Sequence, residues 1–137
     1  MTTITGGCLC GAVRYEVKGE PVGQAVCHCR HCQRQSGSAF SVLLAVPAPA
    51  LVLHGPDGLY EDLGESGATV ERYFCSKCGS PLYSALPASP DVVFVKAGTL
   101  DDPTIMAPRV HVWCDSAWPS TPIPDKAIRF GKNPPAG

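Results

Sequence analysis

The chain lacks several features that would place it in a large class of proteins. It has no run of about 18 apolar residues, the length that a membrane-spanning helix needs. It has no cluster of lysines and arginines, and its formal net charge is −1, so nothing indicates a nucleic-acid partner. Its first twenty residues do not contain the apolar core of an export signal. We therefore expect a cytoplasmic protein that binds neither membrane nor nucleic acid.

Long helical patterns are also absent, and short strands take their place. The 137 residues suit one domain, and 14 glycines with 14 prolines favour many turns. Segments of strand length and apolar or alternating pattern occur at 12–18, 22–27, 39–46, 51–54, 69–75, 81–86, 91–98 and 109–114. We expect a ligand loop and a helical turn between them that ends at Gly37, a surface hairpin loop at 55–68, and a wrapping or partly disordered arm from Pro119.

These segments show no internal repeat, and no linker divides them. The sequence therefore predicts one all-β, mainly antiparallel domain over residues 1–137, with a core at about 4–118 and a C-terminal arm at 119–137.

Cysteine is the residue that carries chemistry here. Seven of the eight cysteines fall into three groups, which are Cys8 and Cys10; Cys27, Cys29 and Cys32; and Cys75 and Cys78. In a reducing compartment, thiols at such short spacings indicate metal ligands rather than disulfides. The third group is followed by Gly79, and C-x-x-C-Gly is the pattern of a zinc knuckle.

Seven thiolates fill one tetrahedral zinc site and leave a second site one ligand short. Joining the first and third groups closes a structural site on Cys8, Cys10, Cys75 and Cys78, and it ties together segments nearly seventy residues apart. The group of Cys27, Cys29 and Cys32 then lacks a fourth ligand. Candidates for that position are His28, His31, His111, water or a substrate atom; an iron–sulfur site is a lesser alternative.

Three motifs in this order, GGCLCGAVRYEV, CHCRHCQRQSGSAF and ERYFCSKCGSPLY, resemble those of the glutathione-dependent formaldehyde-activating enzyme family. That family also includes the centromere protein V-like proteins. The resemblance covers most of residues 4–98 and is weaker over 109–118. It implies a β-tent fold of several small sheets stapled by two zinc ions per chain, one structural and one catalytic. The catalytic ion would lie on Cys27, Cys29 and Cys32, and one of the two ions could be labile.

The resemblance also implies an activity, a carbon–sulfur lyase-type reaction that forms or cleaves S-hydroxymethylglutathione from formaldehyde. Glutathione, or a related small thiol, would then be the substrate or cosubstrate, and an aldehyde its partner. The alternatives are a non-catalytic binding module with two zinc staples, or a labile-zinc or redox sensor whose thiolates oxidise.

A few further residues are candidates for the site. Arg30 and Arg34 could bind the carboxylates of glutathione, or they could be solvated loop charges. His111 could face the open metal position as acid, base or ligand, or it could be a half-buried strand residue. We expect Cys114 to be a small, buried apolar residue.

Overall fold

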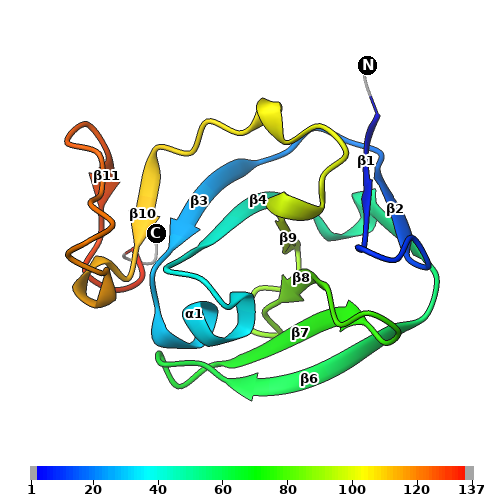
Figure 1. Cartoon of the computed structure of the whole chain (residues 1–137), viewed down its shortest axis with the longest axis horizontal. Coiled ribbons are helices and arrows are strands. Elements are labelled where there is room, and N and C mark those ends of the chain that lie inside the picture. The colour runs from blue at the N-terminus through cyan, green and yellow to red at the C-terminus, as the bar shows by residue number, and fades with distance from the viewer. Residues whose placement is uncertain (1–2, 135–137) are drawn as a thin grey trace.

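Two sheets of unequal size make up the computed structural model, which describes residues 3–134. The smaller sheet has the order β1-β2-β5 and is antiparallel, with β1 at Ile4–Gly7, β2 at Arg14–Val17 and β5 at Leu51–His54. Figure 1 shows β1 and β2 at the opposite end of the molecule from the last two strands, β10 and β11.

The larger sheet has eight strands in the order β11-β10-β3-β4-β9-β8-β7-β6. Their bounds are β3 Gly23–Cys27, β4 Ser41–Pro47, β6 Asp57–Leu63, β7 Thr69–Cys75, β8 Pro81–Ala85, β9 Val92–Lys96, β10 Val110–Val112 and β11 Ile128–Arg129. All neighbours are antiparallel except β10, which is parallel to both β3 and β11.

Helical structure is brief. The α-helix α1 spans Arg30–Ser36, and residues 3–134 contain four short 3₁₀ helices at Ala48–Ala50 (η1), Ala97–Thr99 (η2), Pro103–Ile105 (η3) and Cys114–Ser116 (η4). Gly37 ends α1 in the left-handed conformation, with φ of 68°, and its N–H donates to the carbonyl of Gln33. None of the described helices has the length and apolar character needed to span a membrane.

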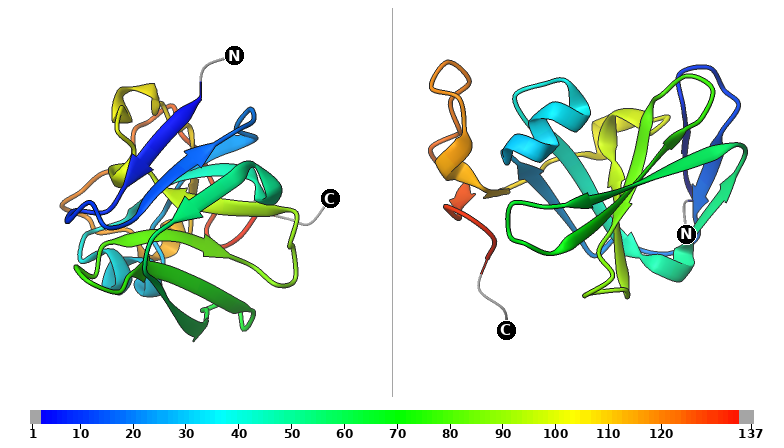
Figure 2. Two further views of the ribbon diagram at one scale, coloured as in Figure 1. Left: turned by 90° about the vertical axis from the view of Figure 1, so that its right-hand side faces the viewer. Right: turned by 90° about the horizontal axis from the view of Figure 1, so that it is seen from below.

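The main core lies where the small sheet packs on the middle of the large one. Tyr15 and Val17 of β2 meet side chains of β4 and β9, and the buried members of this cluster are Tyr15, Val17, Leu44, Val46, Val93, Val95, Ala97 and Leu100. The right-hand view of Figure 2 shows β1 and β2 at one end and the C-terminal segment at the other. The sequence-based prediction of an all-β, mainly antiparallel fold is therefore confirmed, and the β-tent description is consistent with it.

Three strands depart from the sequence-based prediction. Residues 57–63 form β6, the edge strand paired with β7, where we expected a surface loop. β6 was missed because its residues are largely exposed and lack clear alternation. β1 was missed because two of its four residues are glycine, and β11 because it has only two residues within the proline-rich arm.

Candidate metal centres and the adjoining pocket

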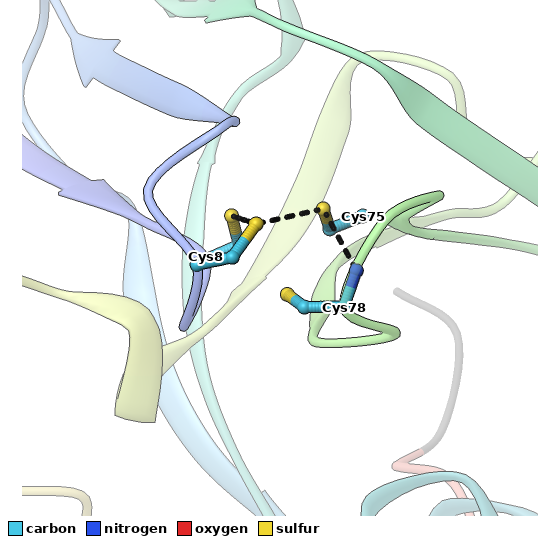
Figure 3. A group of neighbouring side chains, drawn as sticks. Cys8, Cys75 and Cys78 are labelled. Atoms are coloured by element: carbon cyan, nitrogen blue, oxygen red, sulfur yellow. Dashed lines mark hydrogen bonds between the residues drawn. The ribbon is translucent and has the colours of Figure 1, made fainter.

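The first cysteine cluster joins two distant turns. Cys8 and Cys10 follow β1, whereas Cys75 ends β7 and Cys78 lies in the turn that leads to β8. The Sγ atoms of these four cysteines all lie within 4.8 Å of one another. Figure 3 shows Cys8 facing Cys75 and Cys78 from the opposite loop. The Sγ of Cys10 lies 3.6 Å from that of Cys8 and 3.8 Å from that of Cys75.

Backbone and hydroxyl groups point at these sulfurs. The N–H of Val13 donates to Cys8 Sγ at 3.2 Å, and the N–H of Lys77 donates to Cys75 Sγ at 3.4 Å. Hydrogen bonds from Ser80, first from its side chain, lower the pKa of Cys78 to about 5. Gly79 has a φ of 80°, which lets the chain turn back into β8 as the knuckle pattern requires. These surroundings favour a thiolate at Cys78. At Cys10 the backbone of Ala12 lowers the pKa, but the hydrogen bond with Cys8 acts against it and the pKa is raised to about 11.

The second cluster forms where β3 runs into α1. Cys27 is the last residue of β3, Cys29 is the N-cap of α1, and Cys32 lies within the helix; their sulfurs also lie within 4.8 Å of one another. Cys29 Sγ accepts the N–H of Cys32 at 3.2 Å, so the cap that starts the helix also orients the ligand group. Each of the three residues is 7 % exposed.

A buried tryptophan side chain lies against the second cluster. Trp113 is buried and packs against the three cysteines, and its φ of 57° places it in the left-handed region that bulky residues avoid. The C-terminal arm holds it there, because Trp113 Nε1 donates to Asn133 Oδ1 at 2.8 Å and its backbone N–H donates to the carbonyl of Lys132. The arm thus reaches the neighbourhood of the three cysteines.

Both donor sets suit zinc. Four sulfurs at close range make a closed tetrahedral site, and three sulfurs make a site with one open position. Thiolate donors select soft or borderline metals over magnesium or calcium. In the described residues, the second group contains the three cysteines and no histidine or carboxylate. A metal ion held there would receive three ligands from the described residues of the chain.

The histidines considered as a fourth ligand have other partners. His28 and His111 are both buried, and His28 Nε2 lies 2.9 Å from His111 Nδ1 with the rings stacked. Burial lowers the pKa of both rings. His31 Nδ1 lies 2.8 Å from Asp62 Oδ2. The structure therefore does not bring His28, His31 or His111 into the cysteine group.

A pocket of about 710 Å³ lies along α1, the helix that carries Cys32. It is lined by Arg30, His31, Arg34, Gln35, Tyr60, Asp62, Glu65 and Arg72. Arg30 and Arg34, the two arginines that the sequence singled out, therefore share one pocket. The Arg30 guanidinium donates to the side chain of Gln33, and among the described residues no hydrogen bond involves the Arg34 guanidinium. Of the two arginines, Arg34 is therefore the one whose guanidinium is available to bind a ligand in the pocket.

Two buried cations beside the second cluster were missed by the sequence analysis. Arg72 of β7 is 6 % exposed and donates from Nε to Asp62 Oδ2 at 2.9 Å. Lys96 of β9 is 5 % exposed and donates from Nζ to Ser41 Oγ at 2.9 Å. Burial lowers the pKa of Lys96, and the charge of Cys32 opposes that effect.

The charges of these cations act on Cys32, whereas hydrogen bonds with Cys29 and Cys32 raise the pKa of Cys27. Hydrogen bonds from Cys27 and then Cys29 lower the pKa of Cys32, and the positive charges of Lys96 and Arg72 lower it further. The sequence held one weak signal of this arrangement, a lysine that ends the otherwise apolar run VVFVK. The pattern could not place that lysine beside cysteines more than sixty residues earlier.

Cys114 stands apart from both groups. It is half-buried rather than fully buried, and its Sγ donates to the carbonyl of His111 at 3.4 Å. A substitution of Cys114 is therefore a suitable control for substitutions of the seven grouped cysteines.

The chain resembles known proteins over most of its length. The family model for the glutathione-dependent formaldehyde-activating enzyme matches residues 3–116. A Halomonas elongata protein described under the same enzyme name is 31 % identical over 119 residues, which is 82 % of this chain and 76 % of that protein. A Schizosaccharomyces pombe protein described as an uncharacterised lyase is 29 % identical over 97 residues, or 71 % and 68 % of the two chains.

A solved structure shares the fold. The crystal structure of a Rhodobacter sphaeroides protein superposes with a TM-score of 0.58 at 22 % identity, and it covers 77 % of this chain and 92 % of that one. The order of the motifs, the two cysteine groups and the match over residues 3–116 agree with one another. The chain belongs to the glutathione-dependent formaldehyde-activating enzyme family.

Proposed function

We propose that the chain is a zinc-dependent enzyme of the carbon–sulfur lyase type that joins glutathione, or a related small thiol, to formaldehyde or reverses that reaction. The observation that carries the proposal is the three-sulfur group, which is one ligand short of a tetrahedron and shares its helix with a pocket lined by three arginines and two acidic residues. The family match and the lyase-named relative support the reaction type. Cys27, Cys29 and Cys32 would hold the catalytic ion, and Cys8, Cys10, Cys75 and Cys78 the structural one.

In the synthetic direction, the thiol sulfur forms a bond to the carbonyl carbon of formaldehyde. The π electrons of the carbonyl move to its oxygen, and that oxygen takes up the proton that the thiol has lost, so the product is a hydroxymethyl thioether. A zinc ion, when bound, supplies one thing: it lowers the pKa of a thiol enough to make it a thiolate at neutral pH.

The residues of the chain bind and orient the thiol. Arg34 is exposed on the pocket wall, where its guanidinium can pair with a substrate carboxylate. Arg30 lies on the same wall but is turned toward Gln33, so it adds positive charge more than a direct contact. Trp113 and the burial of the cysteines keep water away from the sulfur cluster.

The test is the rate of adduct formation from formaldehyde and glutathione, measured above the spontaneous reaction. Wild type and Cys114→Ser, whose substitution lies outside both groups, should raise that rate, and Cys32→Ser should not. Zinc content should be two ions per chain in the first two proteins and one in Cys32→Ser. If all three zinc-loaded proteins leave the spontaneous rate unchanged, the chain is a zinc-stapled binding module instead.

The redox-sensor alternative receives less support. An oxidant would have to reach the same three cysteines as the thiol substrate, each 7 % exposed, so burial does not separate the two readings; the family match and the lyase-named relative favour the enzyme.

A further inference from the structure

A second cavity, of about 290 Å³, lies between the two sheets. Leu51 and Leu53 of β5 in the small sheet contribute to its lining, as do Glu71 and Tyr73 of β7 in the large one. The pocket along α1 contains Arg72 instead. Because successive residues of a strand point to opposite faces, the two cavities lie on opposite faces of β7.

A small residue in the large sheet explains why this space exists. Glu71 is directly opposite Ala85 of β8, which in turn is directly opposite Val93 of β9, so the three side chains form one row across the sheet. The methyl group of Ala85 fills little of the room between its two larger neighbours. Since a cavity of about 150 Å³ accommodates a benzene ring, the space here suits one ring with a short chain.

The next row of the sheet gives the cavity an aromatic wall. Tyr73 and Tyr83 are directly opposite each other, and their rings stack with centroids 4.4 Å apart and an angle of 5° between the planes. Both tyrosines are half-buried and line the cavity. The face of an aromatic ring attracts cations as well as apolar groups.

The charge at the cavity is negative and has no partner among the described residues. Glu71 is the only charged residue among those that line the cavity in this part of the chain. It is directly opposite Glu61 of β6, and neither glutamate takes part in a described ion pair. Like charges directly opposite each other destabilise a strand pair, and a cation beside Glu71 would relieve that repulsion.

We propose that this cavity binds a small organic ammonium ion, with its apolar body against Leu51, Leu53 and the stacked tyrosines and its positive charge at Glu71. Pockets for small molecules have this composition, with mostly apolar walls and a few polar groups that select the ligand. The site lies outside both cysteine groups, and the proposal does not depend on the function proposed above.

The test compares two probes of nearly the same shape, 2-phenylethylammonium and the neutral 2-phenylethanol. Each is titrated into the zinc-loaded protein, and binding is followed by calorimetry and by the proton chemical shifts of the Tyr73 and Tyr83 rings. For a ligand of about ten non-hydrogen atoms, we expect a Kd of about 1 mM for the ammonium ion. The alcohol should bind about fivefold more weakly, because it lacks the charge.

Three variants separate the charge from the space. Glu71→Gln keeps the shape of the side chain and should reduce the preference for the cation to about twofold, the part that the aromatic rings contribute. Ala85→Leu fills the cavity and should abolish the binding of both probes. Glu20→Gln removes an exposed glutamate outside the lining, and it should leave both affinities as in wild type.

Equal binding of the two probes by wild type would overturn the proposal, and so would a fivefold preference that persists in Glu71→Gln. The absence of shifts at Tyr73 and Tyr83 with about 10 mM of either probe would overturn it as well. If Ala85→Leu does not fold, Ala85→Val replaces it, and it should weaken both probes. Unchanged binding in the cavity-filling variant would place the probes elsewhere and contradict the assignment.

Discussion

At the pocket wall, Arg34 is the cation best placed to meet a substrate carboxylate. It is exposed, it lines the pocket, and among the described residues its guanidinium has no hydrogen-bond partner. We predict that Arg34→Gln raises the KM for glutathione about tenfold, the loss expected for one charge-assisted hydrogen bond. Steady-state kinetics with 2-mercaptoethanol, which has no carboxylate, should show no such rise.

Arg109→Gln serves as the control for Arg34, because Arg109 is exposed and lies outside the pocket lining. An equal rise in KM for both thiols, or for both variants, would remove Arg34 from the binding site.

The pair of His28 and His111 makes stability depend on pH. Burial lowers the pKa of both rings below that of an exposed histidine, about 6.5, so the unfolded chain takes up protons first as the pH falls. The stability that this pair contributes is therefore complete above about pH 6.5 and is lost toward the lowered pKa values of the folded state. Urea unfolding of the zinc-loaded protein should show less loss between about pH 7.5 and pH 5.5 in His111→Gln than in wild type.

The exposed His54 gives the control for this measurement. His54→Gln should lose as much stability as wild type over the same range. A loss in His111→Gln as large as that of wild type would contradict the assignment of the pH dependence to the buried pair.

At the scale of the element, β1 depends on a glycine that lets it approach the core. A Cβ on Gly6 would lie 2.3 Å from the Tyr15 hydroxyl oxygen and 2.5 Å from the carbonyl oxygen of Thr99. Tyr15 is buried and bonds Thr99 at 2.7 Å, so it cannot move away freely. We predict that Gly6→Ala lowers the free energy of unfolding by about 1–3 kcal/mol, measured by urea denaturation.

Gly23 of β3 is the matched control, because a Cβ there meets nothing within 4 Å. Gly23→Ala should leave the free energy of unfolding unchanged or raise it slightly. Equal effects at both positions would mean that strand propensity, and not the close approach to Tyr15, explains the effect of replacing Gly6.

The strands also show which elements can be predicted from the local sequence pattern and which cannot. Strands with an apolar side, such as β2 and β9, were predicted because burial imposes a pattern on their residues. β6 was not predicted, because an edge strand with mostly exposed residues needs no such pattern. What makes it a strand is its pairing with β7 over seven residues, and pairing of this kind is not visible in local composition.

At the scale of the whole molecule, the first cysteine cluster joins the small sheet to the far end of the large one. Cys75 is completely buried and lies with Cys8 from the loop after β1. The binding free energy of a metal held by distant segments is coupled to folding. We predict that Cys75→Ser lowers the free energy of unfolding by more than about 4 kcal/mol, and that Cys32→Ser, within one local segment, lowers it by less than about 2 kcal/mol.

Denaturation of the two variants beside Cys114→Ser checks this order, with Cys114→Ser close to wild type. Comparable destabilisation by Cys75→Ser and Cys32→Ser would show that both clusters are staples, and it would favour the binding-module alternative.

Cysteine spacing predicted the two groups that the structure brings together, because ligand pairs beside glycine turns are local features. The charged residues around the second group could not be predicted from the sequence. Lys96 and Arg72 come from β9 and β7, and only the order of strands in the large sheet brings them to cysteines at the end of β3. Likewise, the sequence left open whether His111 faces the metal position or is a half-buried strand residue, and the structure buries it against His28.

The central claim is that the second metal centre has an open position which a thiol can occupy, and zinc X-ray absorption tests it most directly. With one centre of four cysteines and one of three, we predict about 3.5 sulfur ligands per zinc in the protein alone and about 4 after glutathione is added. A sulfur count that stays the same on addition of glutathione would contradict the account.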